Sequence, residues 1–392
     1  MHVNYDPQIS YECVQCGRSC FNRWDIGVED SVAQALKGHQ LELRVIQERG
    51  QAFRQGDDGQ RIIYKDSDHP RCGFLKEDLL CSIHSDLGFE AKPLTCQQYP
   101  YVFVQTPDRQ IHASAVYSCT AVREEIGPTL QESRESIEDL IRRGARVHRL
   151  DGNIEVLPPF ETSYAEIQAY EAELNRKLGE MPISAAFEEA ILGLANAISS
   201  LGQPDQESVL LEEGLLASSW GRAKLVPAAA RSQLQLIKTI LSMGLLKPCL
   251  PSQDREVWQK IDAAVLGDAD LEIPDFNWHA PLSELDLWIN EGVGHRFDAQ
   301  IKRFQSSLLF RKAHLTMGGL LPGLMLVWIM PTVIRLLTGL HAWMEQNEPG
   351  LNNFLWGLET AETHLVGHTF DTVPVYQRAA WQAVSISRAY QL

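Results

Sequence analysis

The stretch YECVQCGRSCFNRW, residues 11–24, places three cysteines within eight positions: Cys13, Cys16 and Cys20. Four more follow before residue 120: Cys72, Cys81, Cys96 and Cys119. The eighth, Cys249, stands alone in the rest of the chain. Cysteines this close together form either a disulfide framework or a set of metal ligands. Their distribution also sets a first domain of ordinary size apart from a long segment that is poor in cysteine.

The cellular compartment indicates whether clustered cysteines form disulfides or bind a metal. The opening residues, MHVNYDPQISYEC, contain no basic segment followed by an apolar one, so we expect no secretory signal. In the cytoplasm thiols stay reduced, and clustered cysteines there are typical of metal-binding or catalytic sites. Disulfide frameworks also serve chains below about 80 residues, whereas this chain has 392. We therefore expect a cytoplasmic metal-binding protein.

The composition is that of a globular protein, with 44% hydrophobic and 22% charged residues. The formal net charge of −16 argues against nucleic acid as a partner, because phosphate binding needs a basic surface. The overall pattern predicts a mainly α protein: a small irregular cysteine-rich metal-binding domain with short hairpins, then a large irregular helical domain. We expect three segments: a cysteine domain at 1–125, a helix-and-hairpin connector at 126–160 and a helical domain at 161–392.

Individual elements follow from local signals. In the cysteine domain, residues 29–50 predict one helix, residues 52–66 a hairpin around Gly56–Gly59, and residues 110–119 a short strand. In the connector, a helix is expected from Pro128 to about Gly144. Residues 146–158 then predict a second hairpin, because Asp151-Gly152 is a strong turn signal. Beyond residue 162, apolar stripes predict helices that include 185–202 and 229–244.

One segment, residues 315–334, is uncharged and long enough to span a bilayer. It contains Pro322, Pro331 and three glycines, which suit a kinked or broken pair of buried helices better than a membrane span. We expect a buried core helix there and no membrane partner.

The cysteine spacing is C-x2-C-x3-C, then C-x8-C-x14-C, with Cys119 downstream. Thiolates are soft ligands that select zinc, copper(I) or iron–sulfur clusters. Four of them satisfy one tetrahedral zinc ion or one [4Fe–4S] cluster. The spacing matches neither a zinc ribbon nor a ferredoxin and does not name the metal. Because there are more thiols than one zinc ion can use, an iron–sulfur cluster is favoured over zinc.

Two pairs involving histidine offer other ligands. His84 follows Cys81 by three residues, so zinc could use both, although a surface or capping histidine is the plainer interpretation. His364 and His368 in HLVGH share one helix face, which makes a second metal site conceivable. That pair lacks the glutamate of H-E-x-x-H, so it offers no protease base. No glycine-rich nucleotide loop and no nucleophile elbow is present.

Three segments resemble the YkgJ-type cysteine-cluster family, described as a zinc- or iron-chelating domain: CVQCGRSC at 13–20, CGFLKEDLLCSIH at 72–84 and KPLTCQQYP at 92–100. Flagellin lysine-N-methylases resemble the same domain. The resemblance covers about the first 120 residues. It implies these metal ligands: Cys13, Cys16, Cys20, Cys72, Cys81 and Cys96. Ser19 stands where the family has the first cysteine of a doublet, and Cys119 is the candidate to replace it.

The resemblance leaves two functions open. The first is an enzyme like flagellin lysine-N-methylase, which would use S-adenosylmethionine to methylate lysines of a protein substrate. Since the chain has no dedicated loop for this cofactor, S-adenosylmethionine would have to bind by an unfamiliar route, and an iron–sulfur cluster with an open iron could ligate it. The second is a zinc- or iron-binding interaction module in which the metal only holds the fold. No catalytic residue can be named from the sequence.

Overall fold

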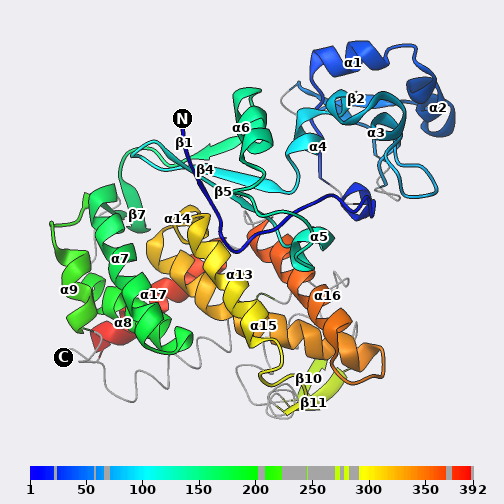
Figure 1. Ribbon diagram of the computed structural model, residues 1–392. Coiled ribbons are helices and arrows are strands. Elements are labelled where there is room, and N and C mark those ends of the chain that lie inside the picture. Colours follow the sequence, from blue (N-terminus) through cyan, green and yellow to red (C-terminus); the bar gives the residue numbers. More distant parts are fainter. Residues whose placement is uncertain are drawn as a thin grey trace. The chain divides into compact units, whose positions relative to one another are not determined.

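The computed structural model describes residues 1–21, 24–56, 59–65, 71–201, 208–222, 245, 270–273, 278–281, 291–367 and 373–389 (Figure 1). The protein is mainly α, as predicted. It divides into two compact units, Met1–Arg149 and Leu150–Leu392. The boundary lies inside the segment that we predicted as a connector, 126–160. The predicted helix at 229–244, Cys249 and His368 lie outside the described residues.

The first unit is built on a four-stranded sheet with the order β1-β5-β4-β6. Its strands are β1 (His2–Tyr5), β4 (Tyr101–Gln105), β5 (Gln110–Ala115) and β6 (Val147–Arg149). The hairpin β4–β5 is antiparallel, and β1 and β6 add to its two sides in parallel. Strand β5 confirms the strand predicted within 110–119.

The helix α6 (Arg134–Arg142) buries Ile137 and Leu140. It starts later than predicted because the Glu132 carboxylate binds the amide and hydroxyl of Thr129 in a separate turn.

The cysteine-bearing part of this unit consists of short elements. They are η1 (Arg18–Phe21), α1 (Asp30–Leu36), α2 (Gln40–Arg49), β2 (Phe53–Gln55), β3 (Arg61–Ile63), α3 (Ser82–Leu87), η2 (Phe89–Ala91), α4 (Leu94–Gln98) and α5 (Thr120–Arg123). The antiparallel pair β2–β3 confirms the predicted hairpin. The single helix predicted over 29–50 is wrong. Gly38 adopts a φ of +73°, and His39 caps α2 by accepting a hydrogen bond from the Leu41 amide at 3.2 Å, so the chain forms two helices.

The hairpin predicted over 146–158 is also wrong. Strand β6 pairs with β4 in the first unit, whereas β7 (Ile154–Leu157) pairs with β8 (Phe160–Thr162) in the second. The Asp151-Gly152 turn therefore separates two sheets and does not join two paired strands. Gly152 takes a φ of +72°, as a tight turn requires, but the strands on either side find other partners.

The second unit is helical, with two small sheets among its described residues. Its elements, besides β7 and β8, are β9 (Val209–Leu210), β10 (Asp270–Ile273), β11 (Trp278–Pro281), α7 (Tyr164–Glu180), α8 (Ile183–Ser199), α9 (Leu215–Arg222), α13 (Asp298–Phe310), α14 (Ala313–Thr316), α15 (Leu320–Met344), α16 (Leu351–Ala361), the π-helical turn η6 (Glu362–Val366) and α17 (Val373–Ala389). Helix α8 confirms the helix predicted over 185–202 and buries Phe187, Ile191, Leu194 and Ile198.

Helix α15 forms the centre of this unit and packs against α8, α16 and α17. It is long and apolar enough to cross a membrane, yet 83% of its most apolar window is buried within the protein. The predicted break lies before the helix, at Gly318 and Gly319, which have φ angles of +80° and +116°. Pro331 stays inside a continuous helix. The apolar surface that α15 buries outweighs the hydrogen bond lost at this proline.

Buried ion pairs anchor the segment before α15. The Arg311 guanidinium donates to both carboxylate oxygens of Glu362, at 2.8 and 3.0 Å, and both side chains are at most 4% exposed. Next to it, Glu171 of α7 accepts from Lys312 at 2.6 Å and is bonded to His314 at 2.8 Å. Burial alone would raise the pKa of Glu171, but His314 and Lys312 outweigh it and lower that pKa to about 2.

The contact between α8 and α9 requires a glycine at position 193. A Cβ on Gly193 would overlap the carbonyl oxygen of Ser219 in α9. We therefore expect Gly193→Ala to lower the free energy of unfolding by about 1–3 kcal/mol. Gly179 in α7 has open space around it, so Gly179→Ala is the matched control. It should raise stability by about 0.5–1 kcal/mol, because alanine favours a helix. Denaturant unfolding of both variants checks this, and similar effects at the two sites would contradict the packing argument.

Candidate metal centre

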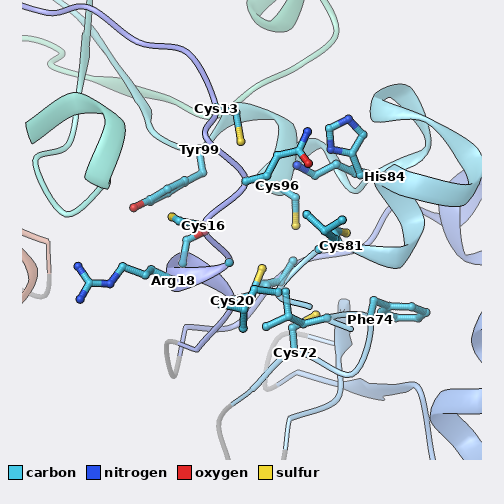
Figure 2. Close-up of a pocket in the computed structure, with 18 of the residues that line it drawn as sticks. Cys13, Cys16, Arg18, Cys20, Cys72, Phe74, Cys81, His84, Cys96 and Tyr99 are labelled. Carbon is cyan, nitrogen blue, oxygen red and sulfur yellow. The ribbon is translucent and has the colours of Figure 1, made fainter. Parts of the chain in front are cut away.

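Seven cysteines line a single cavity in the first unit, with a volume of about 320 Å³ (Figure 2). They are Cys13, Cys16, Cys20, Cys72, Cys81, Cys96 and Cys119, the residues singled out from the sequence. All seven are free thiols, so none of them is paired in a disulfide. Segments that are distant in sequence therefore contribute cysteines to the same cavity.

Four of these cysteines form what we call the inner group: Cys20, Cys72, Cys81 and Cys96. Cys20 lies in η1, Cys81 directly precedes α3, and Cys96 lies in α4. The amide of Cys72 donates to the carbonyl of Cys20 at 2.8 Å, which joins two of these segments. Each of the four thiols interacts electrostatically with the others. In Figure 2 the sulfur atoms of the inner group surround a common space.

The remaining three form the outer group: Cys13, Cys16 and Cys119. The thiol of Cys16 lies 3.8 Å from the Thr120 hydroxyl. Cys119, the neighbour of Thr120, is buried and interacts electrostatically with Cys16. Cys13 is exposed and hydrogen-bonded to the hydroxyl of Tyr11. In Figure 2, Cys13 and Cys16 lie to one side of the inner group. The sequence grouped Cys20 with Cys13 and Cys16, but the fold separates it from them.

The surroundings raise the pKa of several thiols. Burial, followed by repulsion from Cys72 and Cys81, raises the pKa of Cys20 to about 12. Burial also raises the pKa of Cys119 to about 11 and raises those of Cys72 and Cys96. Since metal ligands are thiolates, proton loss here requires compensating positive charge. A metal centre supplies such charge, so the donor set fits one.

Backbone amides and two lysines partly oppose the effect of burial, because each of them lowers the pKa of a nearby thiol and so favours its thiolate form. The amide of Phe74 donates to the sulfur of Cys72, and those of Ala121 and Val122 donate to the sulfur of Cys119. Hydrogen bonds to sulfur of this kind tune iron–sulfur clusters. Lys65 and Lys92 interact electrostatically with the inner group and lower the pKa of Cys20.

The two lysines are held close to the thiols by specific contacts. Lys65 donates to the carbonyl of Trp24 at 2.7 Å, and Lys92 lies 5.0 Å from the ring centroid of Phe89. Burial lowers the pKa of Lys65, while Cys72 and Cys20 oppose that shift. Sequence reasoning did not identify either lysine as part of the site. The only signal for Lys92 was its position in KPLTC, four residues before Cys96.

The geometry bears on the kind of metal. In the part of the chain that the structure describes, no three Cys, His, Asp or Glu side chains converge as ligands of a single ion. A mononuclear zinc site needs its sulfurs about 2.3 Å from one metal. In a [4Fe–4S] cluster each thiolate binds its own iron, so the ligand sulfurs stand farther apart. The preference for a cluster therefore rests on the number of free thiols, which exceeds what one zinc ion uses.

The candidate histidines His84 and His364 lie in different units of the protein. His84 lines the cavity in α3, with its ring edge-on to Phe89 at 5.7 Å between centroids. Burial, with a contribution from Lys92, lowers its pKa, which favours the neutral imidazole. His364 lies in η6 of the second unit. His368 lies outside the described residues, so the HLVGH pair stays a prediction.

Gly17 allows the loop of η1 to pack against the turn at Leu79. Its φ is +67°, and a Cβ there would lie 2.7 Å from the Leu79 carbonyl oxygen. We expect Gly17→Ala to displace the loop that carries Cys16 and Cys20, to destabilise the unit by several kcal/mol and to lower metal content. Gly50→Ala is the control, because Gly50 has a φ of +80° but open space. Gly50→Ala should lower the free energy of unfolding only by the left-handed strain, about 1–2 kcal/mol, and should keep the metal content of the wild type. Equal metal loss in both variants would contradict the role given to this contact.

Comparisons with protein-family models, with curated proteins and with solved structures gave no match to this chain.

Proposed function

We propose that this protein binds an iron–sulfur cluster through the inner group, Cys20, Cys72, Cys81 and Cys96. The observation that carries the proposal is the arrangement of four free thiols, from separate segments, around one space in a shared cavity. Four thiolates are the full protein ligand set of a [4Fe–4S] cluster. Seven free thiols are more than a single zinc ion uses, which favours a cluster.

The residues around the inner group support the same proposal. Lys65 and Lys92 offset the negative charge of the thiolates, and the Phe74 amide donates to the sulfur of Cys72. Three of the four cysteines pack against the hydrophobic core that contains the fourth, Cys72. A cluster held there would supply electron transfer or a Lewis-acidic iron, shielded from water by that core.

A methyl-transferring enzyme is the second candidate, and the cavity wall supports it. Beyond the thiols, Tyr11, Trp24 and Tyr99 line the cavity, with the Trp24 and Tyr99 rings 6.0 Å apart. Such an aromatic wall suits the adenine of S-adenosylmethionine, and the resemblance to flagellin lysine-N-methylase points to a lysine-bearing protein as acceptor.

Two measurements test these proposals. Protein purified without oxygen should be brown and contain about four irons and about four sulfides per chain or more. A colourless protein with stoichiometric zinc would overturn the cluster proposal. Incubation with labelled S-adenosylmethionine and lysine-rich acceptor proteins tests the enzyme. Label transfer by the wild type, and none by Cys81→Ser, would support a methylase. Transfer that does not depend on bound metal would instead contradict the role given to the cluster.

A further inference from the structure

We propose that Cys20 and Cys72 form a disulfide when the inner group holds no metal, and that this bond is a redox switch of the site. The bond itself does not depend on the proposed function, because both thiols are free side chains of the protein. Its consequence, the loss of two metal ligands, rests on that function. A peroxide closes the switch, and a small thiol such as glutathione reopens it.

The backbone holds these two cysteines at the separation that a disulfide needs. The amide of Cys72 donates to the carbonyl of Cys20 at 2.8 Å. A hydrogen bond of this kind places the two Cα atoms about 5–6 Å apart. Disulfides join Cα atoms that are about 4.4–6.8 Å apart. The bond can therefore form by rotation of the two side chains, without movement of the segments that carry them.

The two thiols are also neighbours. After burial, Cys72 contributes most to the raised pKa of Cys20, ahead of Cys81. Figure 2 shows the sulfur atoms of Cys20 and Cys72 at the border of one space. Cys81 and Cys96 border the same space, but Cys81 is bridged to Leu75, and Cys96 lies within α4. Since other contacts hold those two backbones, the fold favours the pair Cys20 and Cys72.

Access decides which thiol reacts first. Cys20 is partly exposed at the cavity, whereas Cys72 is buried. Hydrogen peroxide oxidises the Cys20 thiol to a sulfenic acid and releases one water molecule. The sulfur of Cys72 then attacks the sulfenic sulfur, and its proton leaves with the hydroxyl group as a second water molecule. Two thiols and one peroxide thus give one disulfide and two waters, while the charge of Lys65, which acts on both sulfurs, favours each attack.

The disulfide changes what the site can bind. It removes Cys20 and Cys72 from the ligand set, so the inner group keeps only half of the thiols that a [4Fe–4S] cluster uses. It also closes a loop that contains α1, α2, β2 and β3. Because Cys72 belongs to the hydrophobic core of this part and Cys20 packs against it, the oxidised unit keeps its fold. Oxidation therefore blocks metal loading and leaves the protein folded.

Peptide mapping of the full chain tests the bond, because trypsin separates the cysteines. Cleavage after lysine and arginine, but not before proline, places Cys20 in residues 19–23, Cys72 in residues 72–76, and the other two inner cysteines in residues 77–109. Metal is removed with a chelator, peroxide is added, and the remaining thiols are blocked. We expect 19–23 and 72–76 as one linked peptide, two hydrogen atoms lighter than their sum. An unlinked 19–23, or one linked to 77–109, would overturn the pair.

Variants and iron binding complete the test. Cys72→Ser should lose the linked peptide, and Cys96→Ser, the matched control, should keep it. Ferrous iron is added alone, because sulfide would reduce the disulfide. The oxidised wild type should bind less iron than the reduced wild type, and a thiol reductant should restore binding. Equal iron binding by the two forms, at any level, would overturn the switch. If neither form binds iron, the proposed cluster fails as well, whereas the linked peptide still decides the bond by itself.

Discussion

Cys81→Ser is expected to release most of the iron bound by the inner group and to loosen the cysteine-bearing part of the first unit. Serine keeps the size of the side chain but is a much poorer ligand for a soft metal. A metal centre that joins distant segments contributes on the order of 10 kcal/mol to the folding of the domain it holds. The loss should therefore be visible in both iron content and denaturant unfolding.

Cys249→Ser is the control, because Cys249 stands far from the cluster in sequence. It should keep the iron content and stability of the wild type. If Cys81→Ser retained all of its iron, Cys81 would not be a ligand and the composition of the inner group would be wrong.

Arg311→Met is expected to lower the free energy of unfolding of the second unit by about 3–5 kcal/mol, because it leaves the Glu362 carboxylate buried without a counter-charge. Glu362 accepts both of its guanidinium bonds from Arg311. On the scale of a domain of this size, the loss corresponds to a fall in Tm on the order of 10 °C. Thermal unfolding followed by circular dichroism measures it.

Two further variants test whether the unpaired charge causes the loss of stability in Arg311→Met. Replacing both partners, in Arg311→Met/Glu362→Leu, should recover most of the lost stability, since no unpaired charge remains. Arg176→Met is the surface control, because Arg176 pairs with Glu173 and Glu180 on the exposed face of α7. It should change stability little. A double variant as unstable as Arg311→Met would mean that packing, and not the unpaired charge, causes the loss.

The clustering of seven cysteines before residue 120 allowed them to be singled out as candidate site residues. The helical fold could be predicted because apolar stripes are a local feature of the sequence. It did not reveal the division into inner and outer groups. Cys20 is close to Cys16 in sequence, but the hydrogen bond from the Cys72 amide to its carbonyl joins it to a segment about fifty residues later. Lys65 and Lys92 were missed for the same reason, since only the fold brings them to the thiols.

The errors in secondary structure also have long-range causes. Asp151-Gly152 is a turn, as predicted, but a turn signal does not specify the partners of the adjacent strands. Strand β6 gains a better position beside β4, where it extends an existing sheet. The break in the 29–50 helix could have been found from Gly38 and the capping residue His39.

The cavity takes its wall from both ends of the first unit, and Cys16 meets Thr120 across 104 positions of sequence. During translation the earliest cysteines leave the ribosome long before their neighbours in space exist. Until the segment around residue 119 has been made, these side chains are open to peroxide and to wrong pairing. If the inner group binds a cluster as proposed, its iron can be inserted only after that segment has been made.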